Sequence, residues 1–142
     1  MIPKFRAWTK IGKRMFFSDD ILAIDYENKE IVAQQVCFES GLAVERDIYC
    51  CDFDELELMQ STGLFDKNGK EIFEGDVIAI EVDDTETPIN ARVFQNSKIG
   101  VLMFHVFEDN EDVPMVELLE DNSVAFEIIG NIYENPELLE VE

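Results

Sequence analysis

Three groups of side chains in this chain have the types and spacing that could do chemistry: a histidine, a pair of carboxylates and a pair of cysteines. The single histidine, His105, lies in the apolar run GVLMFHVF. At strand spacing it shares a face with Met103 and Phe107. Nucleophilic catalysis needs a base within hydrogen-bond reach of Ser, Cys or Thr, so we interpret His105 as part of a sheet wall and not as a catalytic base.

The two carboxylates, Glu74 and Asp76, flank Gly75. Two readings are open: they face one side of a bend and hold a hard metal ion, which prefers oxygen ligands, or Asp76 accepts hydrogen bonds from backbone amides of the corner. We favour the second. With 32 acids in the chain, a carboxylate pair at glycosidase spacing arises by chance. We therefore predict no catalytic residue, no metal and no cofactor, and the chain is not expected to be an enzyme.

Cysteines are odd in number, Cys37, Cys50 and Cys51, and form no CxxC motif. An odd set argues against a secreted disulfide framework. The adjacent Cys50 and Cys51 could be a redox pair, but a vicinal disulfide strains the peptide between them. We expect reduced thiols, with one buried in a strand.

Charge is the strongest feature of the composition: 32 acids and 11 bases give a net charge of −21. A soluble surface alone would explain it, but such a surface also repels nucleic acid and anionic membranes and attracts basic partners. Direct nucleic-acid binding is not expected. No apolar run approaches the roughly 20 residues of a membrane span, and the N-terminus lacks the apolar core of a signal peptide. The expected location is cytoplasmic.

The bases are concentrated near the N-terminus, where Lys4, Arg6, Trp8 and Arg14 are our candidate interaction residues. Together with Phe5, Phe16 and Phe17 they resemble an aromatic platform for nucleic acid, which the net charge opposes. We expect Arg6 and Arg14 to pair with acids of the C-terminal part instead, within one chain or between two. A homo-oligomer is therefore a candidate assembly, and a basic host protein is a candidate partner.

Short strand-like segments recur at intervals of roughly ten residues, with turn residues between them. They cover residues 4–8, 14–17, 21–26, 31–38, 46–53, 77–82, 89–95, 100–107, 113–119 and 124–133. Segment 31–38 could also be helical, and a strand is favoured. The pattern predicts a mainly β fold, with a smaller β-rich part over 1–60, an SH3-type small β-barrel over 61–135 and a short acidic helical tail over 136–142.

The stretch TGLFDKNGKEIFEGDVI, residues 62–78, contains two tight corners. Asp66 and Asn68 at the front of a type I turn, with Gly69 in the left-handed conformation, predict a hairpin with a bulge. Glu74, Gly75 and Asp76 form the second corner.

This stretch, with the preceding LMQSTGL at 58–64, resembles the signature of the YopX family of phage- and prophage-encoded proteins. The opening KFRAW at 4–8 resembles the start of that family, and IGNIYENPELL at 129–139 resembles its ending. The segment between residues 16 and 57 matches nothing in the family pattern. The resemblance implies a phage origin and an SH3-type barrel in the C-terminal half, and it brings no activity, cofactor or catalytic residue. Its motif positions are Gly63, Asp66, Asn68, Gly69, Glu74, Gly75, Asp76, Gly130 and Asn131.

These observations favour a non-catalytic binding or assembly module encoded by a phage or prophage. The alternative is a DNA-mimic inhibitor of a host nucleic-acid-binding protein, because the chain after Lys98 contains acids but no Lys or Arg.

Overall fold

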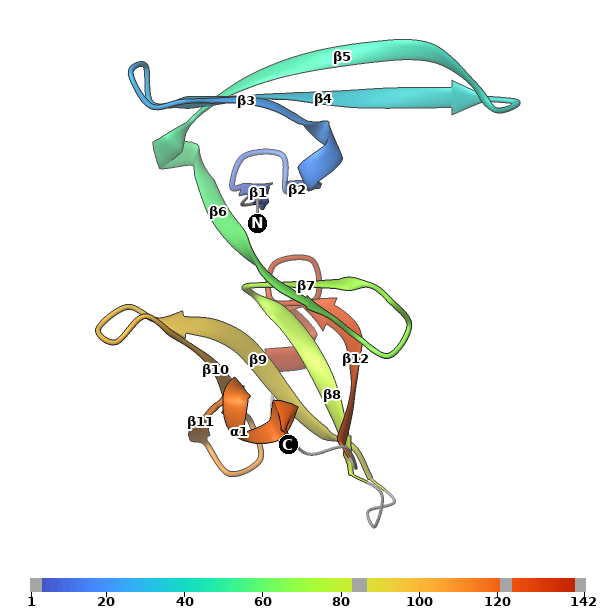
Figure 1. Ribbon diagram of the computed structural model, residues 1–142. Helices are drawn as coiled ribbons and strands as arrows, with labels where there is room; N and C mark the ends of the chain where they lie inside the picture. Colours follow the sequence, from blue (N-terminus) through green and yellow to red (C-terminus); the bar gives the residue numbers. More distant parts are fainter. Residues whose placement is uncertain (1–3, 83–86, 121–123, 140–142) are drawn as a thin grey trace. The chain divides into compact units, whose positions relative to one another are not determined.

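The chain folds into two compact units, Met1–Gln60 and Ser61–Glu142, and both consist mainly of β-strands (Figure 1). The structure is a computed structural model that describes residues 4–82, 87–120 and 124–139. Among the described residues, no helix is long and apolar enough to cross a membrane.

The first unit contains two antiparallel sheets. Its elements are β1 (Phe5–Thr9), β2 (Arg14–Phe16), the 3-10 helix η1 (Ser18–Asp20), β3 (Ile21–Asp25), β4 (Glu30–Glu39), β5 (Leu42–Asp52), the 3-10 helix η2 (Phe53–Glu55) and the start of β6 (Leu56–Phe65). One sheet places β1 between β2 and β6, and the other has the order β3-β4-β5. The strand β6 continues into the second unit.

The core of the first unit is small and apolar. Ala7, Ile31 and Leu56 form its buried centre, with Cys51 and Phe53 among the partly buried side chains around it. Because side chains alternate along a strand, Ile31 and Ala33 of β4 are buried on the same side, whereas the far half of the strand is exposed or half-buried.

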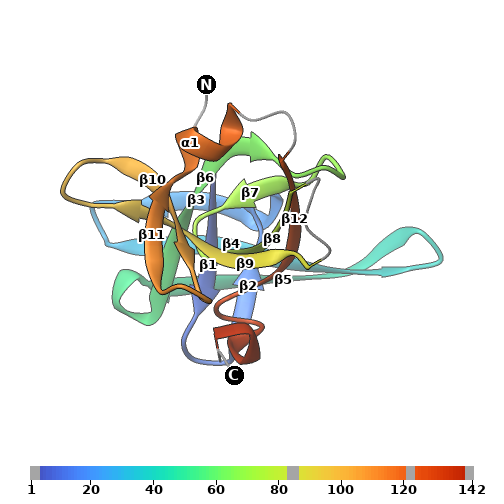
Figure 2. The ribbon, with the colours of Figure 1, turned by 90° about the horizontal axis from the view of Figure 1, so that it is seen from below.

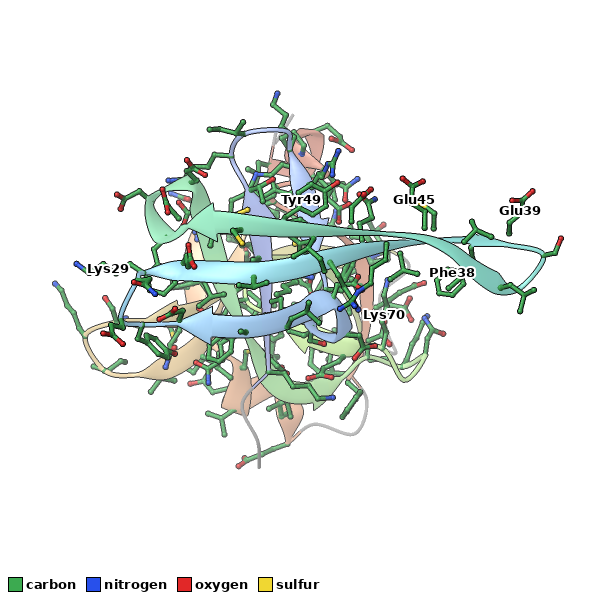
Figure 3. The ribbon with its side chains drawn as sticks, turned by 90° about the horizontal axis from the view of Figure 1, so that it is seen from above. Lys29, Phe38, Glu39, Glu45, Tyr49 and Lys70 are labelled. Carbon is green, nitrogen blue, oxygen red and sulfur yellow. The ribbon has the colours of Figure 1, made fainter. Side chains whose placement is uncertain are left out.

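Strands β4 and β5 form a long hairpin that projects from the unit (Figures 1 and 3). Its turn places Ser40 at a φ of 54° and Gly41 at a φ of 82°, the two left-handed residues that a tight hairpin turn of matching twist requires. Figure 3 shows Phe38 and Glu39 near the projecting end, with Tyr49 closer to the rest of the unit. We call residues 34–48 of this hairpin the arm.

The second unit is built on one five-stranded antiparallel sheet and a hairpin. Its elements are the end of β6, β7 (Glu71–Phe73), β8 (Asp76–Val82), β9 (Ile89–Asn96), β10 (Val101–Val106), β11 (Glu111–Pro114), α1 (Met115–Leu119), β12 (Val124–Asn131) and the 3-10 helix η3 (Pro136–Leu139). The sheet order is β11-β10-β9-β8-β12, and β6 pairs with β7.

One face of this sheet carries the core of the second unit. Figure 2 shows the strands of the sheet from a second direction. The buried residues alternate along β8, β9 and β10, as the period of two of a strand requires, and β7 and α1 each add one. They are Ile72, Ile78, Ile80, Ala91, Val93, Phe104, Val106 and Met115. The rings of Phe104 and Phe126 lie 5.4 Å apart and tie β12 to this core.

The mainly β prediction is confirmed, and so is the strand assignment of segment 31–38, which lies within β4. The hairpin of the first two segments is also present, as β1 and β2. Residues 136–139 are helical as expected, in the 3-10 form, while residues 140–142 of the expected tail lie outside the described residues. SH3-type closure of the second unit stays a prediction.

The expected strand over residues 113–119 is wrong. Strand β11 ends at Pro114, and Met115–Leu119 is the helix α1. Proline has no backbone N–H to continue a ladder, while Met, Glu and Leu favour helix. The helix also buries Met115, which is 1% exposed, in the core.

Three boundaries also differ. The strand expected over 46–53 is β5, which begins four residues earlier, at Leu42, because it pairs with β4 as far as the Ser40–Gly41 turn. Residues 56–60, to which the sequence pattern assigned no strand, form the half of β6 that pairs with β1. The last strand ends at Asn131, two residues before its expected end, because a turn follows.

Candidate interaction surface

The turn after β6 is held by the carboxylate of Asp66, which is only 7% exposed. Oδ1 accepts hydrogen bonds from the backbone N–H groups of Asn68 and Lys70, each at 2.9 Å, and Oδ2 accepts one from Ile128 in β12 at 3.1 Å. Gly69 has a φ of 82°, as the predicted hairpin requires. Burial of the carboxyl raises its pKa, but the three amide hydrogen bonds and the charge of Lys70 outweigh it, so that the pKa of Asp66 is lowered.

The second corner of the family-like stretch is also structural. Oδ2 of Asp76 accepts a hydrogen bond from the backbone N–H of Phe73 at 2.8 Å, and the residue is 1% exposed. Gly75 has a φ of 87°; its N–H donates to the carbonyl of Val93 and its own carbonyl accepts from Ile132, both at 2.9 Å. Asp76 thus takes the backbone-capping role that we favoured, and Glu74 is half-buried beside it.

The C-terminal motif closes a turn onto β12. Oδ1 of Asn131 accepts hydrogen bonds from the backbone N–H groups of Tyr133 and Glu134, at 3.1 and 2.8 Å. Gly130 lies where a Cβ atom would come within 2.6 Å of Oδ1 of Asn135 and 2.8 Å of Cδ1 of Leu138. The glycine lets the chain of η3 approach the strand.

Gly63 is the remaining motif glycine, with a φ of 77° at the irregular pairing of β6 with β7. Its N–H donates to Oγ of Ser61 at 3.0 Å, and Oγ1 of Thr62 donates to the carbonyl of Ile72 at 2.7 Å. The motif positions together organise turns and a bulge in the second unit. These hydrogen bonds and φ values give the motif a role in the fold of the second unit.

The histidine lies in the second unit and the three cysteines lie in the first. His105 is half-buried, and its Nδ1 lies 2.7 Å from Oδ1 of Asp112. Cys37 and Cys50 are exposed and Cys51 is half-buried, all three as free thiols. Within the described ranges, no three residues among His, Cys, Asp and Glu are arranged to hold a metal ion.

The four candidate interaction residues lie in β1, β2 or beside them, in different environments. Lys4 is exposed, Trp8 is half-buried in β1, and Arg6 is only 4% exposed, with its Nε donating to Sδ of Met59 at 3.4 Å. Arg6 is therefore buried within the first unit, and its expected pairing with acids of the C-terminal part stays a prediction. The long aliphatic part of an arginine packs well among apolar atoms, which the alternation of KFRAW alone did not reveal.

Arg14 connects β2 to the arm. Its Nη1 donates to Oε1 of Gln35 at 3.1 Å and to the hydroxyl oxygen of Tyr49, and the guanidinium lies 4.9 Å from the centre of the Tyr49 ring. Tyr49 also packs on Phe16. These contacts lie within the first unit, so Arg14 positions the arm. The expected pairing of Arg14 with acids of the C-terminal part, within one chain or between two, stays a prediction.

Beside the arm, one edge of β4 is open. Strand β3 pairs with β4 only from Glu30 to Ala33, so residues 34–39 have no strand on that side within the described part of the chain. In an antiparallel strand every second residue directs its N–H and C=O to one edge. The open edge therefore presents backbone donors and acceptors in the pattern that a further strand would use.

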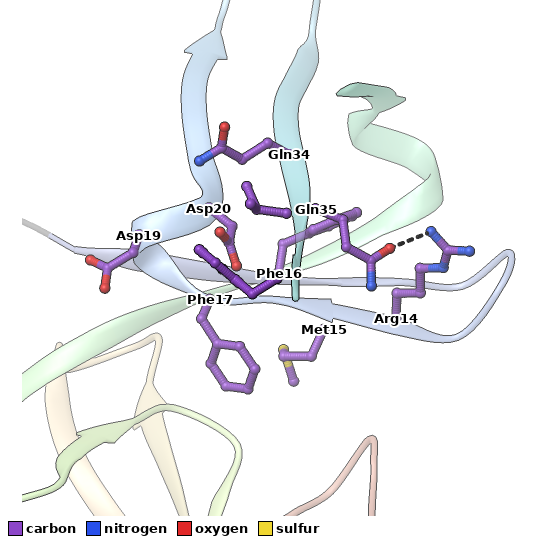
Figure 4. A pocket seen from close by; sticks show the side chains of 10 residues that line it. Arg14, Met15, Phe16, Phe17, Asp19, Asp20, Gln34 and Gln35 are labelled. Atoms are coloured by element: carbon purple, nitrogen blue, oxygen red, sulfur yellow. Dashed lines mark hydrogen bonds between the residues drawn. The ribbon is translucent and has the colours of Figure 1, made fainter. Parts of the chain in front are cut away.

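A groove of about 480 Å³ lies along this edge (Figure 4). It is lined by Arg14, Met15, Phe16, Phe17, Asp19, Asp20, Gln34, Gln35, Val36 and Phe38. Figure 4 places Asp19 and Asp20 on the opposite side from Arg14, whose bond to Gln35 is dashed. Phe17 is 50% exposed and Phe38 is 68% exposed. The groove therefore combines the open edge of β4 with exposed aromatic rings and two carboxylates. We call it the β4 groove.

Sequence reasoning missed the β4 groove. Its acids and Phe38 are far apart in the chain, and the open edge arises because β3 has five residues and β4 has ten. The unequal lengths of the two expected strands were the signal that could have indicated it.

The chain was compared with known proteins. The family model described as YopX protein matches residues 4–140. A crystal structure of protein EF1440 from Enterococcus faecalis is similar, with 30% identity, a TM-score of 0.64 and 99% of each chain covered. The crystal structure of protein yopX from Bacillus subtilis is similar in fold, with 23% identity, a TM-score of 0.61, and 96% of this chain and 98% of that chain covered. No curated protein matches. Over nearly its whole length, this chain belongs to the YopX protein family.

Proposed function

We propose that this protein is a non-catalytic binding module, encoded by a phage or prophage and acting in the cytoplasm of the bacterial host, whose binding site is the β4 groove. The observation that carries the proposal is the open edge of β4 at residues 34–39. An unpaired edge next to exposed apolar side chains is a template for adding a strand from another chain.

The occupant we infer is an extended segment of a partner protein with alternating apolar and basic side chains. Its backbone would pair with β4 in the place that β3 leaves after Ala33. Its apolar side chains would cover Phe17 and Phe38, which are half or more exposed. Its basic side chains would meet Asp19 and Asp20.

Charge supports a basic partner over a neutral one. The two arginines at the arm are already engaged, Arg14 with Gln35 and Tyr49 and Arg46 with Oε1 of Gln34 at 2.6 Å. Within the described residues, Asp19 and Asp20 form no ion pair, so both charges are available to a partner, on a chain with a net charge of −21. Complementary charge raises association rates and selects against acidic competitors.

The test is affinity capture from bacterial lysate followed by a quantitative comparison of variants. We expect a partner that the wild-type protein captures to be lost, or reduced severalfold, with Phe38→Ser and with Asp19→Asn combined with Asp20→Asn. Val116→Ser is the matched control, because Val116 is 52% exposed on α1 of the second unit. Equal loss with Val116→Ser, or capture that none of the groove variants reduces, would contradict the proposal.

A second candidate function is DNA mimicry, favoured by four exposed acids in and beside the β10–β11 turn: Glu108, Asp109, Glu111 and Asp112. Excess duplex DNA in the same capture separates the two. DNA mimicry predicts that duplex DNA displaces the captured partner. It also predicts that Glu108→Gln combined with Asp109→Asn reduces capture, whereas the groove variants do not. Both results together would favour the mimic over the binding module.

A further inference from the structure

The second unit has a cluster of polar side chains on the sheet face away from its core. Arg92 in β9 is the cross-strand partner of His105 in β10, and His105 is the partner of Asp112 in β11. Their chain neighbours Ala91 and Val93, both 0% exposed, face the core. Because side chains alternate, Arg92, His105 and Asp112 form one row on the opposite face.

The imidazole of His105 is held in a fixed orientation. Nδ1 lies 2.7 Å from Oδ1 of Asp112, and because a carboxylate only accepts, Nδ1 is the donor. The ring also meets Phe107 edge-on, with centres 5.8 Å apart and planes at 76°. The second ring nitrogen, Nε2, is therefore the one left for a further partner.

Arg92 differs from other bases of the chain in its partners. Lys67 lies 2.9 Å from Oε1 of Glu81 and 3.5 Å from Oε2 of Glu127, and Lys10 lies 3.4 Å from Oε1 of Glu57. The guanidinium of Arg92 lies over the ring of Phe94, 5.3 Å from the centre of that ring. Across residues 4–82, 87–120 and 124–139, no carboxylate lies within ion-pair distance of it. Among the residues that the structure describes, the guanidiniums of Arg14 and Arg46 also lack a carboxylate but donate to Gln35, Tyr49 and Gln34, whereas the guanidinium of Arg92 contacts only an aromatic ring.

Arg92 and His105 line a cavity of about 320 Å³, together with Phe107, Asn110, Ile132 and Leu139. The polar groups come from β9, β10 and the turn after β10, and the apolar residues Ile132 and Leu139 come from the turn after β12 and from η3. The volume is at the lower end of the roughly 300–1,000 Å³ of small-molecule sites. A small ligand that is charged at one end and apolar at the other fits this lining.

We propose that this cavity binds a small carboxylate with an apolar body. The planar fork of Arg92 would donate two parallel hydrogen bonds to the carboxylate. The amide of Asn110 would add a further hydrogen bond to the carboxylate. Phe107, Ile132 and Leu139 would cover the body. This site lies within the second unit and does not depend on the β4 groove.

The test is a titration followed by backbone amide NMR signals, with benzoate as the probe. Acetate has the same charge without the body, benzamide has the body without the charge, and inorganic phosphate has an oxyanion without the body. We expect saturable shifts at His105, Asn110 and Leu139 with benzoate, about tenfold weaker binding of acetate and phosphate because they bury no apolar body, and none of benzamide.

Variants decide whether Arg92 is responsible. Arg92→Gln should abolish the benzoate shifts, and Arg92→Lys, which keeps the charge and loses the fork, should weaken binding. Lys98→Gln removes the same charge from an exposed turn and should leave binding unchanged. The amide spectrum of each variant without ligand checks its fold. Unaltered benzoate binding in Arg92→Gln, benzamide binding as tight as benzoate, phosphate binding tighter than benzoate, or no saturable shift at these residues would each overturn the proposal.

Discussion

Asp66, in the turn after β6, bonds through Oδ2 to the backbone N–H of Ile128 in β12 at 3.1 Å, although the two residues are 62 positions apart. The adjacent N–H of Lys67 donates to the carbonyl of Phe126 at 2.8 Å. The turn at the centre of the family motif is thus attached to the last strand of the five-stranded sheet, which explains why one acid there has both a local and a long-range role.

Replacing Asp66 with Asn should destabilise the second unit by about 1–3 kcal/mol at neutral pH, because a buried, multiply bonded carboxylate is lost. The folded pKa of Asp66 is lowered, so the ionised group contributes stability above its unfolded pKa of about 3.9, and this contribution disappears as the pH falls through the folded pKa. Urea unfolding, followed by NMR signals of residues 61–139, measures the difference in free energy of unfolding between the variant and the wild type. This difference should become smaller below about pH 4.

Asp25→Asn is the matched control for this measurement. Oδ1 of Asp25 likewise accepts backbone N–H groups, from Glu27 at 3.0 Å and Asn28 at 3.1 Å, but in an exposed turn of the first unit. It should leave the unfolding of the second unit unchanged. If Asp66→Asn lowers the free energy of unfolding equally at neutral and acid pH, the role given to the ionised carboxylate is contradicted.

Replacing Gly130 with Ala should also destabilise the second unit, by about 1–3 kcal/mol, because the new Cβ overpacks a filled space. It would lie 2.6 Å from Oδ1 of Asn135 and 2.8 Å from Cδ1 of Leu138, so the amides of η3 should exchange faster with solvent as well. Ile129→Ala, at a neighbouring residue that is 39% exposed, is the control. If the amide hydrogens of η3 exchange at the same rate in Gly130→Ala as in the wild type, the close approach of η3 to Gly130 does not stabilise η3.

The turns of the motif could be predicted from sequence because their causes are local. Asp66 and Asp76 bond to amides two to four residues away, and Gly69 and Gly75 take left-handed φ values. Such residues favour a turn through their own backbone conformation and through side-chain hydrogen bonds to nearby amides. The bond from Asp66 to Ile128 has no local signal and could not be predicted in this way.

The errors have physical causes as well. The strand expected over 113–119 overlooked Pro114, which ends the ladder. The burial of Arg6 has no signal in its own segment, because it depends on what covers both faces of β1. The β4 groove was missed because it depends on the point where β3 stops pairing with β4, which becomes evident only when the lengths of the two strands are compared.

The three thiols should differ in reactivity. Burial, followed by the charges of Glu55, Cys50 and Asp52, raises the pKa of Cys51, and only the thiolate reacts. We expect iodoacetamide at mildly alkaline pH to modify the exposed Cys37 and Cys50 severalfold faster than Cys51, as measured by mass spectrometry of peptides over time. The urea-unfolded chain, where burial is lost, is the control. Equal rates in the folded protein would contradict the half-buried position of Cys51.

The central claim, that the open edge of β4 accepts a strand, can be tested most directly by NMR titration with a capped peptide of alternating Lys and Val. Peptides of alternating Glu and Val, and of Lys and Pro, test charge and backbone pairing respectively, since proline lacks the N–H. We predict saturable shifts and slowed amide exchange at residues 34–38 with the Lys–Val peptide alone, weakened by Asp19→Asn combined with Asp20→Asn. No change at residues 34–38, or equal binding of the Lys–Pro peptide, would contradict the claim.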